Sequence, residues 1–242
     1  MQNKSNREVC DVDIRVLATM KPYLFFDNAN QTGLEITGDD VYAMAKGAKK
    51  IAFSNPMEST MTITAQIVPF KFYAMLSDGS IDTEAAYGEK VTVACETAGT
   101  LTIPEGVKAG TVFVYKAGEF AETPIEGTFA GTSFTATSPT DIEVGESYDV
   151  GYVILKKTGV QKIAFNNKKT PLDYYVTMLT NDKDENGVLV PKKIVCYKAK
   201  PVRSATFTYS SEGDPVSIEM KFSCLEDKDG NQVDMIELID AE

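Results

Sequence analysis

The sequence predicts a mainly β protein built from antiparallel sheets, and three observations support that fold class. Two segments, Thr60–Ile67 and Val216–Cys224, alternate cleanly between apolar and polar side chains. Such alternation is typical of strands with one face in a core and the other toward water. Many other short apolar runs are separated by Gly, Pro, Asn and Asp, the residues that favour turns. Helical spacing of apolar residues is rare, so we expect an antiparallel β-sandwich or barrel.

Further strands are expected along most of the chain. The runs with strand character are Asp11–Leu17, Ile51–Phe53, Val91–Cys95, Thr111–Tyr115, Tyr152–Leu155 and Tyr174–Leu179. Near the C-terminus, Ala205–Ser210 alternates like a strand, and the turn residues Ser211–Asp214 follow it. The sequence therefore predicts an antiparallel hairpin over residues 204–225.

One helix is predicted, as a single cover on the sheet. Val68–Asp78 has Pro69 at its start, apolar residues at i, i+3 and i+4, and Gly79 just past its end. A second segment, Asp39–Lys46, fits two structures. It is either a short helix capped by an aspartate or an extended segment, and the sequence leaves both open.

The domain organisation is predicted to be discontinuous. Residues 89–150 are rich in Thr, Gly, Ala and Glu, with short strand candidates between Gly or Pro turns. We interpret them as a β-sandwich-like insertion, and residues 1–88 with 151–242 as the β core. The insertion region could instead simply continue that core.

The composition excludes several classes of protein. Hydrophobic residues make up 43% of the 242 positions, as in folded globular proteins, and the net charge is −11. An acidic surface repels phosphate backbones, which argues against nucleic-acid binding by charge neutralisation. The sequence shows no secretory signal and no membrane-spanning stretch. The four cysteines are scattered without a C-x-x-C pair, which indicates reduced core thiols made in a cytoplasm.

Histidine is absent, and this removes most familiar catalytic and metal-binding arrangements. Asp182–Gly187 resembles the first half of a calcium-binding EF-hand loop, but Lys193 stands where a bidentate glutamate must close the shell. Asp227–Asn231 is better explained as a hairpin turn. We therefore predict that the chain is not an enzyme and has no catalytic, cofactor-binding or metal site.

A family resemblance is visible in the two halves of the expected core. The C-terminal half contains Ala205–Phe222, then Asp227–Asn231 and Val233–Glu237; the N-terminal half contains Leu34–Ala43, Gly47–Phe53, Thr60–Ile67 and Val68–Asp78. In order and texture these segments resemble bacteriophage major tail proteins, also called tail tube proteins. The resemblance covers about two thirds of the chain and skips residues 89–150.

The resemblance implies a virion structural protein of the phage tail, made in the host bacterial cytoplasm. Six subunits would join their sheets into a ring, and rings would stack around a tape-measure protein and contact neighbouring tail proteins. DNA would later pass through an acidic bore without lasting binding. We further predict that Met1–Arg7 and Gly38–Pro56 become ordered only when rings stack. The Thr-rich face of Thr60–Gln66 and the face of Ser217 and Glu219 are hypotheses for polar channel or outer surfaces. An ordinary solvated sheet face is the alternative for both.

Three alternatives remain from the sequence. A β-sandwich adhesin or carbohydrate-binding module shares the strands and turns, although the lack of Trp weakens it. Another tail component, such as a terminator or sheath protein, lies within the same structural class. An enzyme using paired carboxylates is the least supported.

Overall fold

A computed structural model of the chain describes residues 3–213 and 215–239. Met1 and Gln2 of the expected N-terminal arm, and Asp214 of the expected turn, lie outside the described residues. Half of the chain is β-strand and 3% is helix, so the mainly β, antiparallel fold class is confirmed. The chain divides into two units, Met1–Ser80 with Ile163–Glu242 (unit 1) and Ile81–Lys162 (unit 2).

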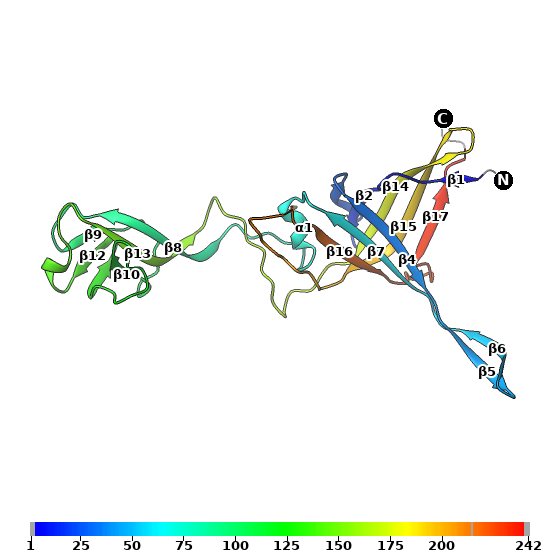
Figure 1. Ribbon diagram of the computed structural model, residues 1–242, viewed down its shortest axis with the longest axis horizontal. Coiled ribbons are helices and arrows are strands. Elements are labelled where there is room, and N and C mark those ends of the chain that lie inside the picture. Colours follow the sequence, from blue (N-terminus) through cyan, green and yellow to red (C-terminus); the bar gives the residue numbers. More distant parts are fainter. Residues whose placement is uncertain (1–2, 214, 240–242) are drawn as a thin grey trace. The chain divides into compact units, whose positions relative to one another are not determined.

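Unit 1 contains one large antiparallel sheet (Figure 1). Its strands are β1 (Lys4–Ser5), β2 (Asp11–Val16), β3 (Lys21–Phe26), β4 (Gln31–Thr37), β7 (Glu58–Ala65), β14 (Tyr174–Asp184), β15 (Leu189–Pro201), β16 (Ile218–Cys224) and β17 (Val233–Glu237). The main path runs β3-β2-β14-β15-β16-β7-β4, with β1 added on β14 and β17 added on β15.

The sheet is rolled so that its two ends approach each other. β3 and β4 are the first and last strands of the path, yet only residues 27–30 connect them. Four residues span at most about 14 Å, so the sheet must curl to bring these strands together. The backbone N–H of Cys10, just before β2, also donates to Oγ1 of Thr32 in β4 at 3.0 Å. Within the described residues, β3 and β4 form no ladder with each other, so the barrel is not closed.

The core of unit 1 lies inside this roll, and the alternation seen in the sequence explains which side chains enter it. Met61, Ile63 and Ala65 of β7 are buried, as predicted, while Ile67 is 74% exposed beyond the strand end. β16 buries every second residue in the same way. The buried set is Val12, Ile14, Phe26, Met61, Ile63, Ala65, Phe72, Met75, Leu76, Tyr174, Val176, Met178, Cys196, Ala199, Ile218, Met220, Phe222 and Cys224.

The predicted helix is present but shorter than expected. α1 comprises Phe70–Ala74, whereas the sequence predicted Val68–Asp78. The turns after Ala74 tighten to i→i+3 hydrogen bonds, and Gly79, at φ +74°, returns its N–H to the carbonyl of Ala74. The predicted apolar stripe nevertheless covers the core, because Phe72 stacks on Phe26 with ring centroids 5.2 Å apart.

The predicted hairpin over residues 204–225 is wrong. Its second arm is the strand β16, but β16 pairs with β7 and β15. Ala205–Ser210 forms no strand in the structure. Alternation indicates that a segment suits a strand, but it does not identify the strand with which the segment pairs. Here β7, from the N-terminal half, pairs with β16. Asp227–Asn231 is a turn as predicted, but β16 and β17, which it connects, both pair with β15 instead of with each other.

The open choice for Asp39–Lys46 resolves in favour of the extended form. β5 (Asp40–Ala45) and β6 (Ala48–Ser54) pair as an antiparallel hairpin that continues from the ends of β4 and β7 (Figure 1). The two turn residues, Lys46 and Gly47, both have positive φ, at +50° and +79°. This turn geometry matches the right-handed twist of the flanking strands, so it favours a hairpin over a helix.

Unit 2 is a small β-sandwich. Its elements are β8 (Ala85–Ala94), β9 (Thr100–Thr102), β10 (Phe113–Lys116), β11 (Gly127–Ala130), β12 (Ser133–Ala136), the 3₁₀ turn η1 (Pro139–Asp141) and β13 (Ser147–Lys156). They form two three-stranded sheets, β10-β13-β8 and β11-β12-β9. The buried residues of unit 2 are Cys95, Leu101, Ile103, Val114, Phe134, Ala136, Ile142, Tyr148, Val150, Tyr152 and Ile154.

The boundaries of unit 2 lie outside the predicted insertion limits of residues 89 and 150. β8 and β13 pair continuously from Ala94↔Ser147 to Ala85↔Lys156. A further bridge joins Asp82 to Lys162, so the two connections to unit 1 leave unit 2 side by side. The amino-acid composition changes only near residue 89. The limits predicted from composition, residues 89 and 150, therefore fall inside β8 and β13.

Candidate assembly surfaces

The main sheet of unit 1 ends in unpaired strand edges. In the described part of the chain, β3 and β4 each have one neighbour in the sheet, and β17 pairs on one side only. Free edges present rows of backbone donors and acceptors to any extended segment that approaches. β3 and β17 also expose apolar side chains, with Phe25 at 58% and Met235 at 56% exposure. These edges are suited to pairing with another chain.

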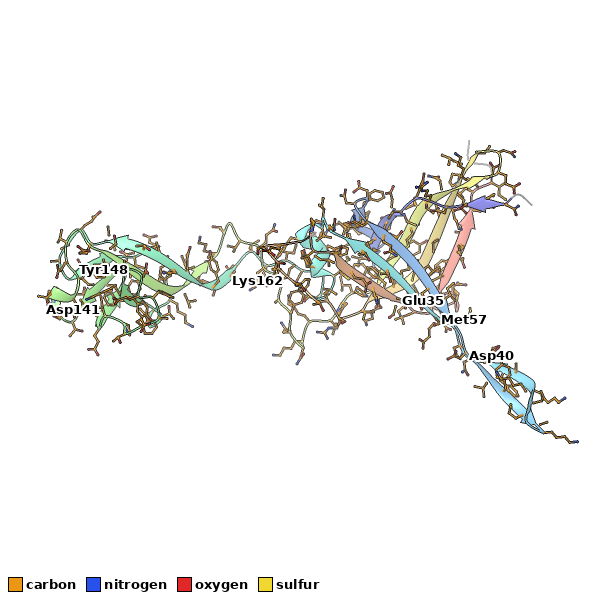
Figure 2. All side chains as sticks on the ribbon, viewed as in Figure 1. Glu35, Asp40, Met57, Asp141, Tyr148 and Lys162 are labelled. Carbon is orange, nitrogen blue, oxygen red and sulfur yellow. The ribbon has the colours of Figure 1, made fainter. Side chains whose placement is uncertain are left out.

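The β5–β6 hairpin is the second unsatisfied element of unit 1. All thirteen residues of its two strands are exposed. Its register places Val41 opposite Phe53 and Ala43 opposite Ile51, so these four side chains share one face. Figure 2 labels Asp40 where the hairpin begins, Glu35 near the end of β4 and Met57 just before β7. An isolated two-stranded hairpin is at best marginally stable in water, so this apolar face needs a partner.

An open apolar groove of about 420 Å³ lies beside α1. It is lined by Phe70, Tyr73, Ile163, Phe165, Phe207 and Tyr209. Tyr73 and Phe207 meet edge to face with ring centroids 5.5 Å apart. The Oγ of Ser77 donates to the carbonyl of Ala164 at 2.6 Å. This bond fixes the chain between Ile163 and Phe165, two residues that line the groove.

A polar contact joins β3 to α1, the helix beside this groove. Nζ of Lys71 donates to the carbonyl of Tyr23, and the Tyr23 hydroxyl donates toward the carbonyls of Lys71 and Gly79 at 3.2 and 3.1 Å. Burial raises the pKa of Tyr23 to about 12, so its hydroxyl stays a donor at physiological pH. These hydrogen bonds hold α1 against β3, whereas Phe70, Phe207 and Tyr209 of the groove are exposed.

A polar face covers the outer side of β4, β7 and β16. Thr60, Thr62 and Thr64 form its centre, with Glu219 opposite Thr64 and Lys221 opposite Thr62. Nζ of Lys221 pairs with Oε1 of Glu219 at 3.0 Å. The predicted alternation of this face is confirmed. Besides the threonines and the Glu219–Lys221 pair, the face carries the exposed Glu35 of β4, opposite Thr60.

The acidity of the chain is divided unequally. Unit 2 carries twelve acidic and six basic residues, while unit 1, twice as long, carries twenty-three and eighteen. More than half of the net charge of −11 therefore belongs to unit 2. The charge of the whole chain is thus a poor guide to the charge of any surface on unit 1.

The acidic Asp182–Gly187 segment, which resembles half of an EF-hand loop, forms hydrogen bonds within the protein. Oδ1 of Asp184 accepts the backbone N–H groups of Asn186 and Val188, which closes the β14–β15 turn. Burial acts to raise the pKa of Asp182, but hydrogen bonds from Asn6 and Lys192 outweigh it and lower that pKa. Among the described residues, no cluster of three or more Cys, Asp or Glu could hold a metal ion. The absence of a catalytic site stays a prediction.

Two further expectations concern the cysteines and the N-terminal arm. All four cysteines are free, and Cys95, Cys196 and Cys224 are buried, in agreement with core thiols. The described part of the arm is paired, since Lys4 and Ser5 lie opposite Asp184 and Lys183. Whether this arm and residues 38–56 become ordered only on stacking stays a prediction.

Comparison with known proteins gives a family match. The model of the YomU/Tube protein family matches residues 7–238, a range that includes both units. No curated protein matches the chain. In the described residues, no helix is long and apolar enough to cross a membrane.

Proposed function

Because this chain belongs to the YomU/Tube protein family, we propose that it is a phage tail tube subunit whose six copies form a ring and whose rings stack into a hollow tube. One observation carries the proposal beyond the family match. Unit 1 has a rolled sheet with unpaired edges and a hairpin whose apolar face has no partner within the described chain. Both deficits are removed when copies pair with one another.

The ring is supported by the sheet edges. Pairing an edge of one copy with an edge of the next, around a closed circle, would cover two of these edges on every subunit. The exposed Phe25 and Met235 lie on these edge strands and would be buried in such contacts. Lateral contact through strands gives every subunit the same environment, as ring symmetry requires.

Stacking is supported by the β5–β6 hairpin. Its strands continue beyond the ends of β4 and β7, so its apolar face can reach a copy in the next ring. Val41, Ile51 and Phe53 are each more than half exposed. Burial of apolar surface contributes roughly 25 cal/mol of stabilising free energy per Å². Stacking would gain this contribution at every subunit of the ring.

The channel function rests on a surface that does not retain DNA. The threonine face of β7 offers short hydroxyl side chains. The Glu219–Lys221 pair beside it is neutral as a pair, and Glu35 opposite Thr60 adds a negative charge. Such a face, with its modest acidic excess, would let a phosphate backbone pass without counterion-releasing contacts. A tape-measure protein would occupy the channel during assembly, and other tail proteins would contact the tube ends. The protein would thus be a virion component.

Unit 2 is proposed to project outward as a decoration of the tube. It has its own core, and both of its connections leave at the Asp82–Lys162 bridge. A domain attached at one place can be carried without interrupting the sheet of unit 1. Its acidic excess would keep the outer surface soluble.

Mass photometry and negative-stain electron microscopy of the purified chain test the proposal. The expected species are particles of six times the 26.4 kDa subunit and hollow tubes built from them. A monodisperse monomer at high concentration, binding components of a glycan panel, would contradict the proposal and favour the carbohydrate-binding alternative.

A further inference from the structure

The segment Ala205–Ser210 has the side-chain pattern of a strand but no partner strand. Ala205, Phe207 and Tyr209 alternate with Thr206, Thr208 and Ser210. Within the described residues, the backbone N–H and C=O groups of residues 205–209 form no hydrogen bond, and all six side chains of the segment are exposed. β-branched and aromatic residues favour strands, so this backbone is ready to pair.

The same segment forms one wall of the groove beside α1. Phe207 is 40% exposed and Tyr209 91% exposed, while Phe165 on a neighbouring wall is 57% exposed. A strand that paired with residues 205–210 would therefore lay its side chains against these rings. The unpaired backbone and the apolar groove together describe a strand-addition site, in which main-chain bonds give affinity and pockets give specificity.

The β5–β6 hairpin of another copy matches this site. It offers free backbone edges and an apolar face containing Phe53, Ile51 and Val41. The hairpin adjoins the Glu58 end of β7, and α1 follows the Ala65 end, so protrusion and groove lie at opposite ends of one strand about 26 Å long. Complementary surfaces at opposite ends join copies head to tail and generate an open stack.

We propose that the groove beside α1 is the receptor for the β5–β6 hairpin of a copy in the adjacent ring, which adds a strand to Ala205–Ser210 and covers Phe165, Phe207 and Tyr209. This inference rests on the proposed stacking and names the surface that receives it. It also gives the alternation of residues 205–210 a purpose: the segment is a strand in the tube, completed between copies.

Cross-linking between copies tests the pairing directly. Two differently tagged chains, both with Cys10→Ser, would carry Phe53→Cys and Tyr209→Cys respectively and be co-assembled and oxidised. We expect a disulfide-linked heterodimer on a non-reducing gel, formed in tubes and absent from subunits kept dissociated. The matched control pairs Phe53→Cys with Phe113→Cys, a half-exposed residue of unit 2, and is expected to give none.

Proline substitution tests strand addition without removing any groove side chain. Neighbouring N–H groups of a strand point to opposite sides, so either Ala205→Pro or Thr206→Pro should remove a bond to the incoming hairpin. Because neither N–H is bonded within the described chain, melting should be unchanged while one of the two variants stops at rings. If both proline variants form tubes and the cysteine pair gives no cross-link, the groove is not the receptor for the hairpin, and the proposed function is unaffected. Failure of the parent chain to form rings or tubes would overturn both.

Discussion

Unit 1 and unit 2 are both antiparallel β structures, but they differ in how much strand edge and apolar surface they leave exposed. Unit 2 encloses its core between two small sheets. Unit 1 has unpaired strand edges and an open aromatic groove, and all thirteen strand residues of its β5–β6 hairpin are exposed. This difference supports the proposal that assembly resides in unit 1, because an incomplete sheet can be completed by neighbouring copies, whereas a domain with an enclosed core needs no partner.

Removing the hairpin is expected to have the largest effect on this comparison. Replacing residues 39–55 by a short Gly-Ser turn deletes the apolar face to which we attribute stacking. We expect rings without tubes in negative-stain images, with the melting of the β core preserved because the hairpin contributes no side chain to the buried set of unit 1. Normal tubes from this variant would assign stacking to another surface.

Core substitutions should separate the stabilities of the two units. Phe222→Ala empties a fully buried position in unit 1 and should cost about 3–5 kcal/mol of its free energy of unfolding. Phe134→Ala is the matched change in unit 2. Differential scanning calorimetry should show each variant lowering a different transition. A single transition lowered by both would mean that the two units unfold as one.

Acid should weaken unit 2 through Asp149. This buried carboxylate accepts a hydrogen bond from Thr92, pairs with Lys90 and accepts the N–H of Gly118, and these contacts lower its pKa to about 2. An unfolded aspartate titrates near pH 3.9, so the stabilisation is complete above about pH 4 and is lost as the pH falls toward 2. Thermal melts of unit 2 from pH 5 to 2 should show this loss. Asp149→Asn should flatten the dependence, whereas Asp141→Asn, an exposed change, should not.

Excising unit 2 should have the smallest effect on assembly. Asp82 and Lys162 are bridge partners, so a short turn can join their neighbours without straining unit 1. We expect tubes of normal length and smaller diameter in electron micrographs. Loss of tubes, with unit 1 still folded by circular dichroism, would show that unit 2 takes part in the ring.

The sequence predicted those features that depend on local pattern. The alternation of β7 and β16 correctly identified their buried faces, and the apolar stripe ending at Gly79 located α1, although its last turns tighten and shorten it. Partner choice is non-local, so Ala205–Ser210 was assigned to a hairpin that does not form. The Lys46–Gly47 turn was the available signal for the β5–β6 hairpin, but Asp39 and Asp40 could equally have capped a helix.

The assembly surfaces were less accessible to sequence reasoning. The groove combines Phe70 on α1 with Phe165 and Phe207, which lie in segments without regular structure and nearly a hundred or more residues away. No periodicity connects such positions. The sheet edges likewise depend on the full strand order, in which consecutive strands β3 and β4 occupy opposite ends. Family resemblance indicated assembly, but only the fold identifies the surfaces that could carry it.

Electron cryo-microscopy of tubes assembled from the purified chain tests the central claim most directly. The account predicts a continuous β wall in which strands of unit 1 pair between copies, with unit 2 outside the wall. Tubes held together by unit 2, with the edges of unit 1 facing solvent, would contradict it.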